Sequence, residues 1–121
     1  MIRIIKVAED RIDIELNGKL DKDEMKTALD ELEDKARDIR EGKMLYTVTE
    51  FHLPTLSAVI HEFSRLPAMF ALIKNFSRGE VLTDKLWLQK AAEMEGMLLP
   101  WMKIKAFDLN EREAAEAWLD S

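Results

Sequence analysis

The sequence predicts an α/β fold in which a mixed five-stranded sheet carries helices on both faces. Short segments that alternate apolar and charged residues, a pattern typical of strands, lie between segments with apolar residues at helical spacing. Strands separated by helices need right-handed crossovers and pair in parallel, whereas a short polar turn joins the first two strands as a hairpin. The predicted order is strand–strand–helix–strand–helix–strand–helix–strand–helix, in a single domain that spans residues 1–121.

The chain begins with the predicted hairpin and a capped helix. Residues 2–7 are predicted to form a strand, and residues 11–16 alternate apolar and charged residues as a half-buried strand does. Asp21 is a good N-cap for the next helix, and Glu24 occupies the capping-box position three residues later. Gly42 supplies the expected end of this helix. Its apolar face is predicted to contain Met25, Leu29, Leu32, Ala36 and Ile39.

The middle of the chain is predicted to hold a third strand and a broken apolar helix. Residues 44–49 favour a strand because they include β-branched threonines and a tyrosine. Pro67 lies inside the apolar segment that follows, where it removes an amide donor and clashes with the preceding turn. We therefore expect two helical pieces, at about 55–66 and 67–75.

The last third of the chain repeats the strand–helix pattern. Residues 77–79 are expected to form a turn, and residues 80–83 a short fourth strand. Asp84 is the expected cap of the next helix, which Gly96 or Pro100 ends.

The fifth strand is predicted at residues 102–107, and Asn110 with Glu113 is expected to cap the final helix. Phe107 is expected to face the core while Lys103 and Lys105 face the other way. The inward residues of the final helix are predicted to be Ala114, Ala117, Trp118 and Leu119.

Composition excludes several classes of function. The net charge of −6 argues against nucleic-acid binding, which needs a basic face to neutralise phosphates. There are no cysteines, so thiol catalysis, disulfides and thiolate metal sites are excluded. Charged residues interrupt every apolar run that could form a signal peptide or a transmembrane segment. The expectation is a soluble, cytoplasmic domain.

The segment from Leu53 to Phe76 is the most informative part of the sequence for function. Only Glu62, Arg65 and Lys74 are charged within it. A helix that is apolar nearly all round must be buried or must cover a ligand, a partner or a membrane. Two apolar stripes are expected here, one packed on the sheet and the other facing a ligand or a second subunit. The candidate ligand-binding residues are Phe63, Leu66, Met69, Phe70, Ile73 and Trp101. The alternative is that these residues are only core.

No catalytic, metal or cofactor site is predicted. The two histidines, His52 and His61, are not spaced as a metal pair on one helix face. Ser57 and Ser64 lie within helical reach of His61, but no glycine-rich elbow surrounds either serine. Ordinary helix serines are the favoured interpretation, and we expect a protein that is not an enzyme.

Several short motifs together resemble a known family. They are Gly18-Lys19-Leu20-Asp21, Val81-Leu82-Thr83-Asp84-Lys85-x-Trp87, Phe107-Asp108-Leu109 and Glu113-Ala114-x-x-Ala117-Trp118-Leu119. Their order and spacing resemble the STAS fold of anti-sigma-factor antagonists and, more closely, its SpoIIAA-like branch, a relative of STAS and CRAL-TRIO lipid-binding domains. The resemblance implies a SpoIIAA-like sheet and a core tryptophan. Trp87, Trp101 and Trp118 are all expected to be core or semi-buried packing residues, and Trp101 has the best claim to exposure because it follows Pro100 in a loop.

The sequence departs from this family where its phosphorylatable members carry a phosphorylation turn. Those members have an Asp-Ser-Ser/Thr-Gly turn at the start of the helix after the third strand, whereas this chain reads Glu50-Phe51-His52-Leu53-Pro54-Thr55-Leu56-Ser57. Thr55 and Ser57 are the only hydroxyl residues near the corresponding place.

Two functions from different classes follow from the sequence. The first is a non-enzymatic binding module that holds a small apolar or lipid-like ligand, or a protein partner, at the apolar helices after the third strand. A second copy of the chain, giving a homodimer, is one candidate partner. The alternative is a STAS-like regulatory protein, of the anti-sigma-factor-antagonist type, that is switched by phosphorylation at Ser57 or Thr55.

Overall fold

The computed structural model describes residues 1–19, 21–51 and 71–121. Its elements, in chain order, are β1 Ile2–Ala8, β2 Arg11–Gly18, α1 Lys22–Ala36, β3 Gly42–Phe51, β4 Phe76–Thr83, α4 Leu86–Leu98, β5 Lys103–Phe107, the 3-10 helix η1 Leu109–Glu111 and α5 Arg112–Leu119. No helix within these ranges is long and apolar enough to cross a membrane.

The five strands form one mixed sheet in the order β1-β2-β3-β4-β5. β1 and β2 pair antiparallel as a hairpin. The pairs β2–β3, β3–β4 and β4–β5 are all parallel. The predicted fold class is therefore confirmed: a hairpin strand extends a parallel sheet whose strands are joined by crossovers.

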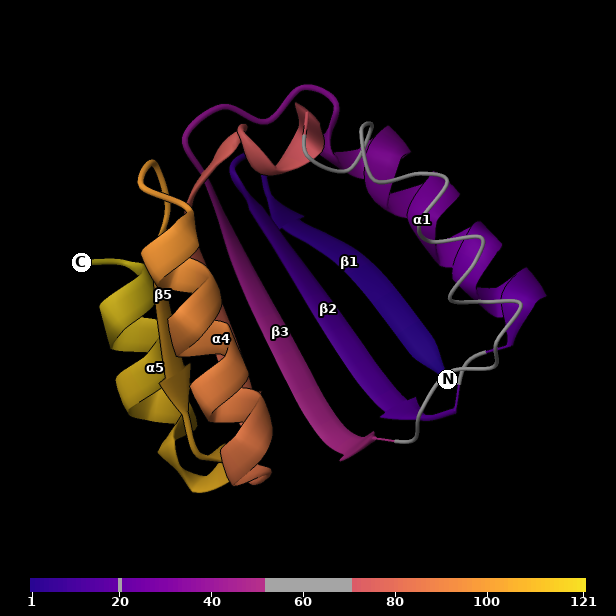
Figure 1. Cartoon of the computed structure of the whole chain (residues 1–121). Helices are drawn as coiled ribbons and strands as arrows, with labels where there is room; N and C mark the ends of the chain where they lie inside the picture. The colour runs from indigo at the N-terminus through magenta and orange to yellow at the C-terminus, as the bar shows by residue number, and fades with distance from the viewer. Residues whose placement is uncertain (20, 52–70) are drawn as a thin grey trace.

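The two faces of the sheet carry different helices (Figure 1). Alternation along β2 sends Ile12 to one face and Arg11 to the other. On the Ile12 face, α1 and Leu99, the residue that follows α4, contribute to the same core. Helix α5 covers the second face, where Ala115 and Leu119 pack on Leu45 and Leu82. The prediction of helices on both faces is thus correct.

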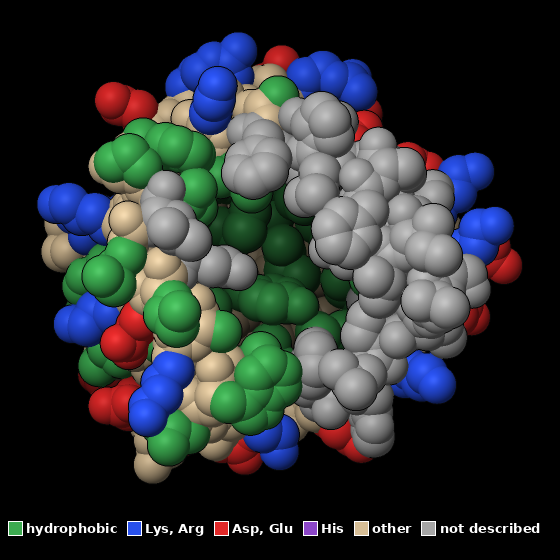
Figure 2. Space-filling view, viewed as in Figure 1, with side chains coloured by type: hydrophobic (Ala, Val, Ile, Leu, Met, Phe, Trp, Pro, Cys, Tyr) green, Lys and Arg blue, Asp and Glu red, His purple; other side chains and the backbone are tan. Residues whose placement is uncertain are grey.

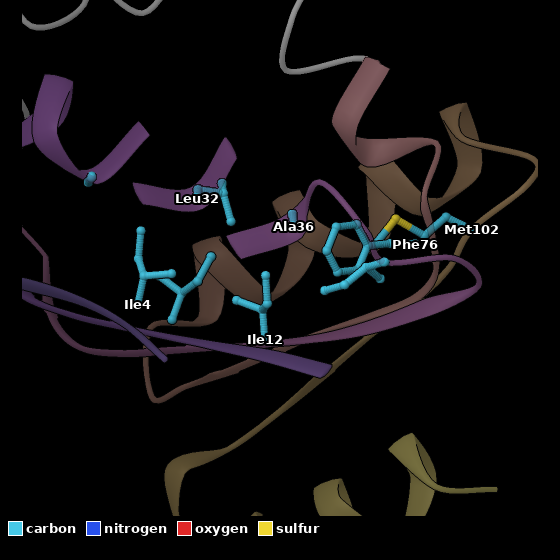
Figure 3. Close-up of a cluster of buried hydrophobic side chains, with 9 residues drawn as sticks. Ile4, Ile12, Leu32, Ala36, Phe76 and Met102 are labelled. Carbon is cyan, nitrogen blue, oxygen red and sulfur yellow. The ribbon is translucent and has the colours of Figure 1, made fainter. Parts of the chain in front are cut away.

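The main core lies between α1 and the hairpin side of the sheet. Ile4 and Ile12 from the strands meet Leu32 and Ala36 from α1, and Phe76 closes the end of the cluster (Figure 3). Helix α1 begins as predicted, since the Glu24 amide donates to the Asp21 carboxylate at 2.8 Å and a complete capping box forms.

The predicted end of this helix is wrong. Helix α1 stops at Ala36, and Gly42 instead starts β3. Glu41 takes a left-handed φ of 49° at the turn. A Cβ on Gly42 would collide with the Ile39 side chain, so glycine is needed here for close packing rather than for a helix cap.

The predicted turn at 77–79 is also wrong. These residues belong to β4, and Arg78 and Gly79 pair with strands on both sides. Ladder bonds from β3 and β5 outweigh the turn preference of Ser and Gly. Helix α4 is not capped by Asp84, because Lys85 is the N-cap residue, and its amide donates to the Thr83 hydroxyl at 3.2 Å.

Two further predictions near the C-terminus are wrong: the side of β5 that Phe107 faces, and the residue that caps the last helix. Lys105 and Phe107 share one face of β5, as residues two apart must, and the Lys105 ammonium lies 5.1 Å from the centre of the Phe107 ring. Phe107 is only half-buried. The final helical segment is capped by Asp108 with Glu111, two residues before the predicted Asn110.

This shift changes which residues of the last helix face inward. Ala115 and Leu119 are buried, whereas Ala114 and Ala117 are exposed and Trp118 is half-buried. Trp87, which was expected to be a core or semi-buried packing residue, is 56% exposed.

Candidate functional site

An apolar cavity of about 310 Å³ lies on the face of the sheet that carries α1 and α4. Figure 2 shows this face hollowed at its centre and lined with hydrophobic side chains. Among the described residues, strands β1 to β5 supply the floor, and α1 and α4 supply walls. Lining residues from these elements include Ile4, Ile14, Met44, Tyr46, Ile104, Ala28 and Ala92.

The spacing of the two helices creates the cavity. Helix α1 contacts β1 near one edge of the sheet, and α4 contacts β4 and β5 near the other edge. Small residues, Ala28 on α1 and Ala92 on α4, line the space between them. The apolar floor comes from strand alternation, which points Ile14, Met44 and Tyr46 to this side.

Two of the predicted ligand-binding residues lie in the described part of the chain. Ile73 is half-buried and lines the cavity. Trp101 is 40% exposed and is not among the described lining residues, but its indole N–H donates to the Ile73 carbonyl at 3.4 Å. Trp101 therefore supports the backbone of a cavity residue.

The other candidates belong to the segment 52–70. Phe63, Leu66, Met69 and Phe70 lie outside the described residues, as do Thr55 and Ser57, the candidate phosphorylation residues. Within the described ranges, no group of three His, Asp or Glu side chains is arranged to hold a metal ion.

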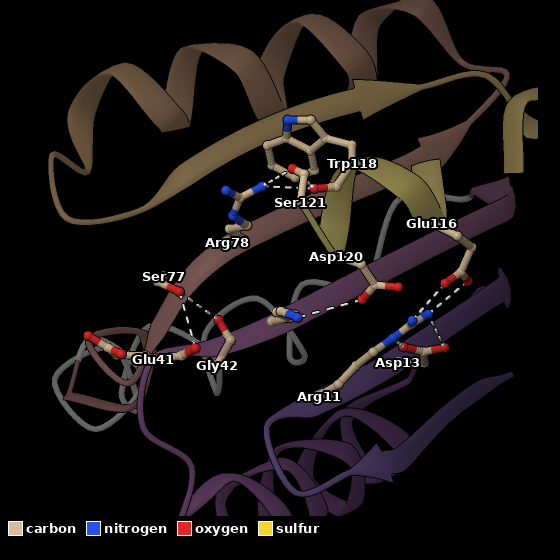
Figure 4. A network of polar contacts seen from close by, with 11 residues as sticks. Arg11, Asp13, Glu41, Gly42, Ser77, Arg78, Glu116, Trp118, Asp120 and Ser121 are labelled. Atoms are coloured by element: carbon tan, nitrogen blue, oxygen red, sulfur yellow. Dashed lines mark hydrogen bonds and ion pairs between the residues drawn. The ribbon is translucent and has the colours of Figure 1, made fainter. Parts of the chain in front are cut away.

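A polar cluster on the opposite face was not anticipated from the sequence (Figure 4). Arg11 donates to the two carboxylate oxygens of Glu116 at 2.6 and 2.8 Å and to those of Asp13 at 2.8 and 3.1 Å. The hydrogen bonds to Glu116 raise the pKa of Arg11, and the same bonds lower the pKa of the Glu116 carboxyl. Alternation placed Arg11 and Asp13 on one face, but Glu116 is 105 positions from Arg11.

Glu80 is buried beside this cluster. It lies on β4 between Gly79 and Val81 and shares the α5 side of the sheet with Leu82, because alternate residues of a strand face the same way. Its exposed fraction is 1%, and neither carboxylate oxygen has a hydrogen-bond partner among the described residues. Burial, followed by the nearby Glu116 charge, raises the pKa of Glu80 to about 7.

Comparison with known proteins identifies the family. The sequence pattern of SpoIIAA-like proteins matches residues 11–120. The chain belongs to the SpoIIAA-like family. The matched residues include strands β2 to β5, most of the cavity lining and the cluster around Arg11, whereas β1 lies before them. A comparison with curated proteins found none that matches this chain.

Two solved structures share the SpoIIAA-like fold with this chain. An uncharacterized protein of the DUF3478 family from Shewanella loihica PV-4 superposes with a TM-score of 0.74 at 20% identity, covering 98% of this chain and 92% of that protein. The Bacillus cell fate determinant SpoIIAA, in its phosphorylated form, gives a TM-score of 0.56 at 15% identity, covering 98% of this chain and 99% of SpoIIAA. At these identities the likeness shows the fold alone.

Proposed function

We propose that this SpoIIAA-like protein is a non-enzymatic binding module for a small apolar or lipid-like molecule. The observation that carries the proposal is the apolar cavity between α1 and α4. Its volume of about 310 Å³ lies at the lower end of the range for small-molecule sites, about 300–1,000 Å³. Its lining is dominated by aliphatic and methionine side chains, which accept apolar groups of irregular shape.

The sequence independently favours the same place. The apolar segment from Leu53 to Phe76 contains Ile73, and Ile73 lines the cavity. The sequence resemblance to relatives of CRAL-TRIO lipid-binding domains points to the same class of ligand.

A fluorescent apolar probe tests the proposal. N-phenyl-1-naphthylamine is titrated with purified protein and then displaced with dodecanol. We expect saturable fluorescence enhancement that dodecanol reverses at a one-to-one stoichiometry. Failure of the probe to bind, with a correctly folded protein, would contradict the proposal.

A cavity-filling variant locates the bound probe. Ala92→Leu adds three carbon atoms to a wall of the cavity, so probe affinity is expected to fall at least tenfold. Ala114→Leu is the matched control, because Ala114 is an exposed helix alanine on α5, on the other face of the sheet. Equal affinity in both variants would place the probe elsewhere.

We propose in addition that the module can bind a protein partner or a second copy of the chain, and an exposed apolar stripe on α4 supports this. Trp87, Met94 and Met97 are each more than half exposed and follow one another at helical spacing. Light scattering after size exclusion tests self-association. Met97→Lys is expected to convert any dimer to monomer, whereas Val7→Lys, at an exposed apolar position on the hairpin, should not.

A phosphorylation switch is the second candidate function. It is favoured by the fold shared with Bacillus SpoIIAA, whose structure was determined in a phosphorylated form. Ser57 and Thr55 are the residues that would carry the phosphate, although the chain lacks the Asp-Ser-Ser/Thr-Gly turn. Phosphosite mapping by mass spectrometry on protein purified from its own cells tests this. Unmodified Ser57 and Thr55 across growth conditions would contradict it.

A further inference from the structure

The second face of the sheet holds a buried carboxyl group beneath α5, on the side of β4 that faces away from the proposed ligand cavity. Glu80 lies near the middle of β4, beneath α5, with both oxygens buried and unpartnered among the described residues. Its neighbours on the same side, Leu82 and Leu45, pack against Ala115 and Leu119 of α5. An ionised carboxylate in this position has lost its water and gained no donor in return.

Polar contacts from the strands to residues of α5 and to Ser121 attach this helix to the sheet. Arg11 binds Glu116 with two hydrogen bonds. Arg78 donates to the Trp118 carbonyl at 2.8 Å and to the Ser121 hydroxyl at 2.7 Å, and its guanidinium lies 5.2 Å from the Trp118 ring centre. The Lys43 ammonium also lies 3.5 Å from the carboxylate of Asp120, the C-cap of α5. Opening of the helix must break these contacts and the small apolar cluster below them (Figure 4).

The charges that face Glu80 come from three elements. Glu116 on α5 and Asp13 on β2 oppose its ionisation, while Arg11 on β2 and Lys105 on β5 favour it. Arg11 already donates to Asp13 and Glu116. Lys105, the pairing partner of Glu80 on β5, makes a cation–π contact with Phe107. None of the four makes a hydrogen bond to Glu80 in the described structure, so burial dominates.

We propose that Glu80 makes the attachment of α5 to the sheet depend on protonation, with the helix closed when Glu80 is neutral and loosened when it is ionised. A neutral carboxyl tolerates the apolar contact with α5. An ionised one is stabilised when α5 lifts and water reaches β4. The raised pKa of Glu80, about 7 against an ordinary 4.5, places this change within the neutral pH range.

The sign of the effect follows from proton binding. Between pH 4.5 and about 7, closed α5 retains a proton on Glu80 that the open form has released, so opening becomes easier as pH rises. Above about 7 both forms are ionised and the effect levels off. Linkage with these two values gives about a tenfold increase in the opening equilibrium between pH 6 and pH 8.5.

Hydrogen–deuterium exchange of the full chain tests the proposal. Rates for the α5 amides, corrected for intrinsic exchange, are compared with those for α1 between pH 6 and 8.5. We expect α5 protection to fall about tenfold in the wild type and to remain below that of α1 at pH 8.5. Glu80→Gln should abolish the pH dependence. Glu15→Gln, at a more exposed glutamate on the polar side of β2, should retain it.

Each alternative outcome overturns the proposal. Equal protection of α5 and α1 at every pH would mean that Glu80 is released only by unfolding of the whole domain. A change below twofold in the wild type would mean that Glu80 does not control the helix. If Glu80→Gln does not fold, a Trp87→Phe, Trp101→Phe variant that keeps Glu80 gives a second test. In this variant, acrylamide quenching of Trp118 on α5 measures how far the helix opens at each pH. Quenching that does not increase with pH would refute the switch.

Discussion

Arg11 and Arg3 lie on the same polar side of the opening hairpin but have very different surroundings. The Arg11 side chain is 14% exposed and binds two carboxylates, whereas Arg3 and its partner Glu15 are both about half exposed. We expect Arg11→Ala to lower the free energy of unfolding by about 2–3 kcal/mol, because it leaves two carboxylates without their charged donor. Arg3→Ala should cost no more than about 0.5 kcal/mol.

Urea denaturation of the two variants measures this difference. Arg11→Lys gives a further comparison, since an ammonium cannot reproduce the bidentate geometry and should recover only part of the loss. Equal costs for Arg11→Ala and Arg3→Ala would show that the cluster beneath α5 contributes no more than a surface ion pair.

The buried Glu80 carboxyl should make the free energy of unfolding of the domain depend on pH. Its pKa is raised from 4.5 in the unfolded chain to about 7 in the folded one, so the folded state binds more protons between these values. The free energy of unfolding should therefore fall as pH rises from 4.5 to about 7 and level off above. The loss amounts to about 3 kcal/mol.

The matched variant for this prediction is Glu80→Gln, which cannot ionise. Thermal melts between pH 4.5 and 8 should show the stability of the variant rising relative to wild type across this window. If the difference in thermal stability between the wild type and Glu80→Gln does not change with pH, the pKa of Glu80 in the folded state is ordinary.

For single residues, the sequence predicts the face of the sheet on which a side chain lies better than it predicts the contacts of that side chain. Alternation correctly separated Ile12 and Ile14 from Arg11 and Asp13. It could not reveal Glu116 as the partner of Arg11, because that contact depends on how α5 crosses the sheet. Glu80 gave no signal either, since an isolated glutamate in a strand is usually solvated.

Helix caps provide a test at the scale of the element. Asp21 and Asp84 both precede a helix, and the sequence predicts both as N-caps. Only Asp21 accepts from the helix backbone, while Asp84 is exposed and its carboxylate oxygen lies 3.7 Å from the Lys85 ammonium. Asp21→Ala should therefore cost about 1 kcal/mol, and Asp84→Ala no more than about 0.5 kcal/mol.

Chemical denaturation decides between the two aspartates, with Asp21→Asn as a control that keeps the capping oxygen. A larger loss for Asp84→Ala would reverse the assignment of the caps. The error at Asp84 has a local cause: Thr83 already accepts from the Lys85 amide, and the Gln89 side chain donates to the Thr83 carbonyl at 2.6 Å.

Element existence was predictable, and element boundaries were not. Periodicity and residue composition together predicted the five strands of the sheet. The Ser77–Gly79 segment, however, has turn-like composition and is nevertheless part of β4. The last helix shows the same limit. A shift of one position exchanges Ala114 for Ala115 on the buried face, and the inward face cannot be chosen from alanines alone.

For the molecule as a whole, the sequence predicts the mixed sheet and its helices because each crossover constrains the next strand. The cavity is a property of a different kind. It depends on the distance between α1 and α4, which are separated by two strands and by residues 52–70 along the chain. The sequence drew attention to Ile73, but it could not show that α1 contributes the opposite wall.

Ligand binding at this cavity must appear in the stability of the whole domain. A ligand that binds only the folded state, at a free concentration of 100 times its Kd, raises the free energy of unfolding by about 2.7 kcal/mol. For a chain of this length that corresponds to a rise in Tm of roughly 10 °C. We expect dodecanol to produce this rise in the wild type and in Ala114→Leu, but not in Ala92→Leu, whose cavity is filled. Displacement of the naphthylamine probe by dodecanol without any rise in Tm would indicate that both molecules bind unfolded chains or aggregates, and the ligand site between α1 and α4 would have to be abandoned.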